Sequence, residues 1–362
     1  MKYSGWDIDY IQNKETYHEI FDKAMVKEVE GSTEELESQI KELTGRKYAV
    51  AVSSATDALR FSLEACGIGP GDEVIVSSFS WISTSSCINM VGATPVFCDI
   101  GLDSYHLSAN SIQRMMTPKT KAVIYTHLYG NMTDTTEIEE LCKQYGMFFI
   151  EDSAQSVGCV YQGRPAGSIG DCSSFSFNGN KVVAGISGGG MFMTDNEDFA
   201  KYVRKVRRHG KDKDFEVLGT NSKMFITNAD VISYRLTQLD KWTEQRNEIA
   251  QFYIDELGED FIVPKMPEPG NVNNWHKFVI RFDNKNERKK IKDVVKNTLG
   301  INLSVHYEKL LYANDLYSSY EYRNDMTPNA EIAVNTVLSL PIHLWLDEEE
   351  LDKLCTTLLM AL

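Results

Sequence analysis

The sequence predicts an α/β fold in which a mostly parallel sheet is covered by helices on both faces and is followed by a smaller α+β domain. Between residues 48 and 194, short apolar runs alternate with segments of helical periodicity, and this alternation is typical of βαβ units. From about residue 260 onward, the order of strand-like and helical segments is that of an α+β domain. A chain of 362 residues is long for one domain and suits a large domain with a smaller one.

The chain divides into three parts on this basis. Residues 1–30 are polar and irregular, and we expect an arm or a short helix that lies on the main body. Residues 31–240 form the predicted large domain, which holds the parallel sheet. Residues 241–362 form a linking helix and the small C-terminal α+β domain.

The elements of the large domain follow from apolar runs and turn residues. A helix from residue 31 to about residue 44 precedes a first strand at 48–52, and a hydroxyl-rich turn then leads into a helix. The other predicted strands are apolar runs at 73–76, 95–98, 122–126, 147–152, 174–177 and 191–194. The predicted helices between and after them cover 108–116, 135–145 and 198–209.

A long helix that includes Val231, Leu236, Leu239 and Trp242 is predicted across the boundary between the two domains. We expect this helix to continue to about residue 257. Strands are predicted at 277–281 and 301–307, and helices at 287–298 and from 347 to the C-terminus.

Composition excludes several classes of function. A net charge of −15 disfavours binding to nucleic acid or to an anionic membrane, because either needs a basic surface. Seven cysteines, odd in number and never in Cys-x-x-Cys spacing, indicate neither a disulfide framework nor a zinc site, and no metal is expected. Buried reduced thiols and the lack of a signal peptide or a segment of transmembrane length predict a cytoplasmic protein.

Polar side chains gather where the predicted strands end. The carboxyl ends of neighbouring strands hold residues 54–57, 79–81 and 152–155 together with His127. Because ligands of such sheets collect at the carboxyl ends of strands, these residues predict a binding site at one edge of the sheet.

Lys181 stands out among the lysines. It follows an alternating Ser/Phe strand at 174–177 and precedes three glycines at 188–190, which places it on a bend near backbone that approaches another group closely. A lone lysine is usually a solvated surface residue. Its small and apolar neighbours favour instead an enclosed amine with a lowered pKa, which suits Schiff-base chemistry.

Two further features have an ordinary structural explanation when each is taken alone: Asp152 after the apolar run 148–150 can be a helix N-cap, and the turn at 54–57 can be a plain capped helix. A third feature is Trp81, an exposed aromatic residue at the end of a neighbouring strand. Taken together with Lys181, they match a flat, phosphorylated aldehyde with a ring nitrogen. The combination predicts pyridoxal 5′-phosphate (PLP) as the cofactor.

The sequence also resembles the DegT/DnrJ/EryC1/StrS sugar aminotransferases over nearly the whole chain from residue 30. Five ordered motifs carry the resemblance: residues 54–59, 71–76, 151–155, the run from 174 to Lys181 with 188–190, and 338–341. The resemblance implies a fold-type-I PLP enzyme. It further implies a homodimer with active sites at the subunit interface, and a nucleotide-linked keto-sugar as the amino acceptor.

The resemblance also implies roles for individual residues. Lys181 corresponds to the lysine that binds the cofactor as an imine and moves the substrate proton, and Asp152 corresponds to the partner of the pyridinium nitrogen. The other cofactor contacts implied are those of Ala55, Thr56, Trp81, Gln155 and Ser176.

Departures from the family pattern affect three more positions. Asn221 corresponds to a phosphate ligand of the other subunit, although Lys223 stands where the family usually has Arg. His306 and Tyr307 are candidate sugar contacts, although the residues that follow them differ from the family pattern.

The resemblance thus implies transfer of an amino group from L-glutamate to the 3- or 4-keto group of a nucleotide-linked 6-deoxyhexose carried by dTDP, UDP or GDP. The amino sugar would enter a surface polysaccharide such as a lipopolysaccharide O-antigen, or a glycoside natural product. The alternatives are a PLP-dependent cyclitol aminotransferase, a sugar dehydratase, and a non-catalytic regulatory protein on the same scaffold.

Overall fold

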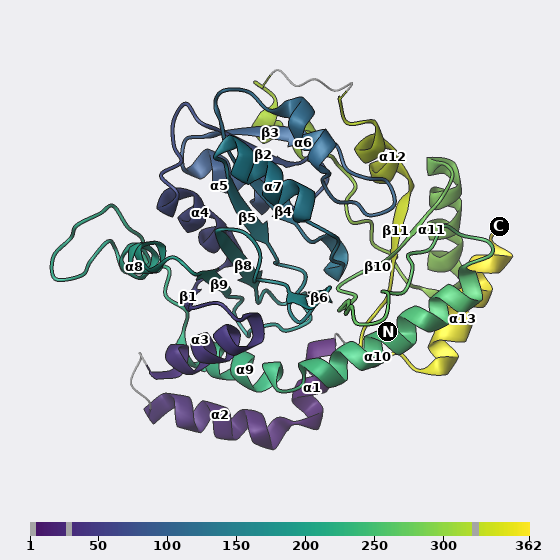
Figure 1. Cartoon of the computed structure of the whole chain (residues 1–362). Helices are drawn as coiled ribbons and strands as arrows, with labels where there is room; N and C mark the ends of the chain where they lie inside the picture. The colour runs from purple at the N-terminus through teal and green to yellow at the C-terminus, as the bar shows by residue number, and fades with distance from the viewer. Residues whose placement is uncertain (1–4, 27–30, 321–325) are drawn as a thin grey trace.

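A seven-stranded sheet forms the centre of the molecule (Figure 1). The computed structural model describes residues 5–26, 31–320 and 326–362. The strands lie in the order β1 (Tyr48–Val52), β9 (Gly190–Thr194), β8 (Cys172–Ser176), β5 (Phe148–Asp152), β4 (Thr120–Thr126), β2 (Glu73–Ser77) and β3 (Thr94–Cys98).

The sheet is mostly parallel, as predicted. Strands β3, β2, β4, β5 and β8 are joined by parallel pairings, and only β9 runs antiparallel to both of its neighbours, β8 and β1. All strands except β9 therefore end at the same edge of the sheet, which is the edge where the sequence places the polar residues.

Helices cover both faces of this sheet. Alternate residues of a strand point to opposite faces, so that Ile75 joins one hydrophobic cluster while Val74 and Val76 join another. The first cluster is covered by α3 (Gly31–Thr44), α6 (Ala109–Met115), α7 (Thr136–Tyr145) and α9 (Ile226–Leu236). The opposite face is covered by α4 (Ala55–Ala65), α5 (Ser83–Met90) and α8 (Glu197–Val206).

A separate hydrophobic core lies in the C-terminal part, at the right of Figure 1. It is built from the antiparallel pair β10 (Phe278–Arg281) and β11 (Val337–Leu340) with α10 (Leu239–Leu257), α11 (Lys285–Leu299) and α13 (Glu348–Met360). The remaining elements are α12 (Pro328–Thr336), the short pair β6 (Val160–Tyr161) and β7 (Arg164–Pro165), and 3-10 turns at Leu128–Gly130, Leu311–Ala313 and Asp315–Tyr317. The division into domains at residue 240 stays a prediction.

The N-terminal part is helical, which is the second of the two forms expected for it. It consists of two helices, α1 (Gly5–Gln12) and α2 (Lys14–Val26). Tyr17 is buried, its hydroxyl donates to the carboxylate of Asp9, and the guanidinium of Arg235 lies 3.3 Å from the same carboxylate. Since Asp9 and Arg235 are 226 residues apart, this anchoring contact leaves no local pattern in the sequence.

Two predictions for the C-terminal part were wrong. The expected continuous helix from 231 to 257 is two helices, because the amides of Thr237 and Gln238 bond three residues back and the Thr237 hydroxyl donates to the carbonyl of Tyr234. The expected strand at 301–307 is an irregular segment that touches β11 by a single bridge between Ser304 and Ser339, and it then turns toward the large sheet. Among the described residues, no helix is long and apolar enough to cross a membrane.

Candidate active site

A cavity of about 450 Å³ opens at the carboxyl edge of the large sheet. Nine of the ten predicted site residues line it, and the tenth, Asn221, does not. The cavity is also lined by residues from the segment just before β10, far along the chain. The nine residues are Ala55, Thr56, Trp81, Asp152, Gln155, Ser176, Lys181, His306 and Tyr307.

Lys181 lies on the turn that follows β8. Its amide donates to the carbonyl of Asn178 at 2.9 Å, which fixes the bend, and its side chain is half-buried. Burial lowers the pKa of the Lys181 amine to about 8, Asp152 opposes this shift, and the charge of Lys277 adds to it. An appreciable fraction of the amine is therefore neutral near pH 7, as a nucleophile requires.

Asp152 is the last residue of β5 and is buried. Its carboxylate accepts hydrogen bonds from the hydroxyls of Thr84 at 2.9 Å and Thr126 at 3.2 Å and from the amide of Ala154 at 3.2 Å. Burial raises the pKa of Asp152, although these donors and Lys181 act in the opposite direction. A carboxyl group in this state is stabilised as an anion by a cationic partner, and a protonated ring nitrogen fits that requirement.

The predicted anion site lies at the N-terminus of α4. The side chain of Ser54 caps the helix by accepting a hydrogen bond from the amide of Asp57. The amides of Ala55 and Thr56 lie in the first turn, where a helix has no acceptor of its own for its amides, so they can donate to an anion. Gly190 packs directly against this turn, since a Cβ there would lie 2.2 Å from the Ser54 carbonyl carbon. The backbone arrangement fits a phosphate group.

Gln155 and Tyr307 are joined to each other across the cavity. The side-chain oxygen of Gln155 accepts from the amide of Tyr129 at 2.8 Å, and its side-chain nitrogen donates to the Tyr307 hydroxyl at 3.1 Å. The ring of Trp81, of which 58% is exposed, lies 6.1 Å from the Tyr307 ring. An exposed, flat indole at the cavity mouth suits stacking on a ring.

Two predicted residues remain: His306 lines the cavity, and Asn221 does not. His306 bonds the Ser339 hydroxyl at 2.8 Å, and burial lowers its pKa to about 4, so that it is a neutral cavity wall at pH 7. Asn221 is exposed and pairs by a backbone bridge with Arg208, away from the cavity of its own chain. Its predicted contact with another subunit stays a prediction.

The sequence reasoning missed residues that contact the cavity or its key carboxylate. Thr84 and Thr126 hold Asp152 but stand 68 and 26 residues from it in the sequence. His276 and Lys277 line the cavity from the segment before β10. The sequence contains one signal for this position: Lys277 stands directly before an apolar strand, and the pattern predicts it only as the first residue of that strand.

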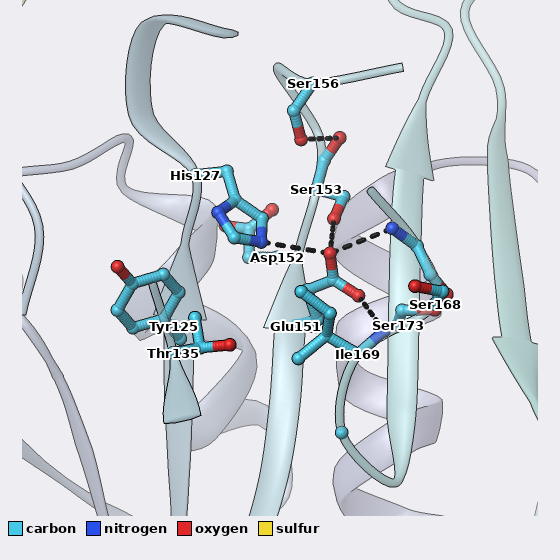
Figure 2. Close-up of polar contacts among 12 residues, drawn as sticks. Tyr125, His127, Thr135, Glu151, Asp152, Ser153, Ser156, Ser168, Ile169 and Ser173 are labelled. Atoms are coloured by element: carbon cyan, nitrogen blue, oxygen red, sulfur yellow. Dashed lines mark hydrogen bonds and ion pairs between the residues drawn. The ribbon is translucent and has the colours of Figure 1, made fainter. Parts of the chain in front are cut away.

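A second carboxylate stands directly behind the site. Figure 2 shows the side chain of Glu151 directed away from Asp152 and toward His127, which lies 3.0 Å from it. Glu151 also accepts from the Ser153 hydroxyl at 2.6 Å and from the amides of Gly167 and Ile169, each at 2.8 Å. His127 was expected at the ligand edge, but its side chain is fully buried in this network and does not line the cavity.

We expect Glu151→Gln to destabilise the protein by about 3 kcal/mol, because an amide nitrogen would face donors that a carboxylate oxygen now accepts. Burial acts to raise the pKa of Glu151, but His127 and the other hydrogen-bond donors lower it by a larger amount. The net effect is a pKa below the ordinary value of a glutamate. The stabilisation is therefore present above the pKa of the unfolded chain and is lost as pH falls through the folded pKa.

Urea unfolding at fixed protein concentration and several pH values measures this loss. The matched control is Glu139→Gln, which breaks the half-exposed ion pair with Arg164 and is expected to cost at most about 1 kcal/mol. Equal effects of the two substitutions would contradict the assigned role of Glu151.

This chain is similar to known proteins over most of its length. The DegT/DnrJ/EryC1/StrS aminotransferase family model matches residues 11–359. A "Pleiotropic regulatory protein" of Geobacillus stearothermophilus is 33% identical over 87% of this chain and 85% of that protein. The dTDP-3-amino-3,6-dideoxy-alpha-D-galactopyranose transaminase of Aneurinibacillus thermoaerophilus is 31% identical over 89% of this chain and 88% of that protein.

Among solved structures, NtdA of Bacillus subtilis with the bound cofactor PMP has a TM-score of 0.83 and 28% identity, over 91% of this chain and 77% of that chain. The expected fold-type-I arrangement is confirmed by likeness to structures of this family. The chain belongs to the DegT/DnrJ/EryC1/StrS aminotransferase family.

Proposed function

We propose that this protein is a PLP-dependent aminotransferase that moves an amino group from L-glutamate to the 3- or 4-keto group of a nucleotide-linked 6-deoxyhexose. One observation carries the proposal: an amine with a pKa near 8 at Lys181 and a buried carboxyl group at Asp152 line one cavity. The nucleotide-sugar transaminase among the relatives supports the acceptor class.

The residues of the cavity fit PLP as a set. When bound, this cofactor supplies an aldehyde that exchanges amines and a protonated ring that accepts electrons. The amides of Ala55 and Thr56, with the hydroxyl of Ser176 on the same wall, would hold its phosphate. Trp81 would cover the ring face, and Gln155 would lie beside the ring with its amide held by Tyr307.

Two residues carry the chemistry in this proposal. The Nζ atom of Lys181 takes the proton from the α-carbon of the amino donor and later returns a proton to the product, which a pKa of about 8 permits in both directions near neutral pH. The carboxylate of Asp152 would hold the proton on the ring nitrogen, because Asp152 is buried and a cation beside a buried carboxylate stabilises it. His306 and Tyr307 form the wall toward the sugar.

The proposal extends to assembly and location. We propose a homodimer in which Asn221 reaches the cofactor phosphate of the other subunit, since its side chain is exposed and does not line the cavity of its own chain. We further propose a cytoplasmic enzyme whose product enters a surface polysaccharide such as an O-antigen. Light scattering of the purified protein tests the assembly, and a monomeric mass would contradict it.

Absorption spectroscopy of the PLP-loaded protein tests the reaction. L-glutamate is expected to bleach the visible band of the bound aldehyde cofactor, and a nucleotide-linked keto-sugar is expected to restore it. A panel of dTDP-, UDP- and GDP-linked 3- and 4-keto sugars, with a cyclitol ketone beside them, identifies the acceptor. A band that no amino acid bleaches would contradict amino transfer and would favour a dehydratase, whereas the lack of any borohydride-sensitive visible band would favour a regulatory protein.

A further inference from the structure

A second cavity of about 440 Å³ adjoins the first one and contains an excess of positive charge. The two cavities share Asn180, Lys181, His276, Lys277 and His306 in their walls. The second cavity adds Arg246, and its one lining carboxylate among the described residues belongs to Asp9. That carboxylate already pairs with Arg235 and Tyr17, so it does not neutralise the cavity.

Lys277 supplies one of the positive charges of this wall, beside Lys181 and Arg246. Its amide is fixed by a hydrogen bond to the carbonyl of Tyr129, and its side chain is half-buried. Within the described parts of the chain, its ammonium group makes no hydrogen bond or ion pair. Burial, with the charge of Arg246, lowers the pKa of Lys277 to about 8. A cation held in this way gains from an anionic ligand.

Arg246 adds charge but has little freedom to bind. Its Nη1 atom donates to the carbonyls of Trp275 and Ile342, each at 2.9 Å, and its Nε atom is buried without a partner. Burial lowers its pKa to about 10, which leaves the guanidinium charged at pH 7. The neighbouring imidazoles of His276 and His306 are neutral, since burial lowers the pKa of both.

We propose that Lys277 binds the distal carboxylate of a dicarboxylic amino donor whose α-carbon lies at Lys181. Both residues line both cavities, so a five-carbon chain can extend from one to the other. A single ammonium is a point charge that suits one carboxylate. A diphosphate would need several free donors directed at one place, whereas the Nη1 atom of Arg246 already donates to two carbonyls and leaves Nε as the unpartnered donor.

Binding of a carboxylate to Lys277 would also change the pKa of the Lys181 amine. The charge of Lys277 lowers the pKa of Lys181, so a carboxylate on Lys277 would cancel this effect and make Lys181 a stronger base when the donor is bound. Lys277 is thus both a specificity-determining and a positioning residue. This inference rests on the proposed amino transfer.

Calorimetric titration of the PLP-loaded protein with glutarate, a five-carbon dicarboxylate that has no amine to transfer, tests the contact without turnover. Lys277→Gln is expected to weaken glutarate binding on the order of ten- to one-hundredfold, as for loss of a charged hydrogen bond. Lys277→Arg is expected to retain most of the affinity. Lys289→Gln, on the exposed face of α11, removes the same charge outside both cavities and is expected to bind as the unaltered protein does.

The monocarboxylate butyrate separates charge recognition from simple filling of the cavity. The unaltered protein is expected to prefer glutarate over butyrate, and Lys277→Gln is expected to lose that preference. Unchanged glutarate binding in Lys277→Gln overturns the proposal, and so does a loss of nucleoside diphosphate binding with glutarate binding intact. A failure of the proposed amino transfer itself is measured separately: in that case glutamate does not bleach the visible band of the unaltered protein.

Discussion

Replacing Lys181 with alanine is expected to lower amino transfer by roughly three to four orders of magnitude and to remove the visible absorption of the bound cofactor. The amine is the one nucleophile on the turn after β8, and its pKa of about 8 allows it to attack an aldehyde and to move a proton at neutral pH. Alanine supplies neither function. Stopped-flow absorption with glutamate, and dialysis to measure cofactor retention, report the two losses separately.

Two comparisons make this result specific. Lys181→Arg keeps a positive charge in the cavity but forms no stable imine, so it is expected to lose activity as fully as alanine does. Lys289→Ala removes a lysine from an exposed helix surface and is expected to behave as the unaltered protein does. Retention of a borohydride-sensitive visible band in Lys181→Ala would show that another lysine binds the cofactor, and Lys277 is the other lysine that lines the cavity among the described residues.

The sequence predicted the central sheet well because its signals are local. Several buried strands have a continuous apolar centre, such as residues 74–76 of β2, and the side chain of Ser54 caps the helix that follows it. The contact that anchors the N-terminal helices and the break near Thr237 were missed. The first depends on Arg235, more than 200 residues away, and the second on one hydroxyl that competes for a helix carbonyl.

The site divides in the same way. Lys181 and Asp152 were found because each stands at a strand end beside turn residues, which is a pattern visible within ten positions. Thr84 supports Asp152 from a helix 68 residues earlier, and Lys277 enters from the segment before β10. No spacing rule links residues that meet only because the fold brings the small C-terminal core against the edge of the large sheet.

Asp152→Asn is expected to lower amino transfer by about two to three orders of magnitude while leaving the fold intact. Asparagine has the same shape and still accepts from Thr84 or Thr126, but it carries no charge to keep a ring nitrogen protonated. It also removes the negative charge that raises the pKa of Lys181. Single-turnover rates with glutamate, measured across pH, separate this loss from any change in cofactor affinity.

The stability of this variant provides the decisive contrast with the adjacent residue. Burial raises the folded pKa of Asp152 above its unfolded value, so the charged carboxylate destabilises the cofactor-free protein, and this cost develops as pH rises through the folded pKa. Asp152→Asn should therefore unfold at an equal or higher urea concentration at pH 7, whereas Glu151→Gln should unfold earlier. If Asp152→Asn instead lost stability as Glu151→Gln does, its carboxylate would be a structural group, and its proposed role at the ring nitrogen would be wrong.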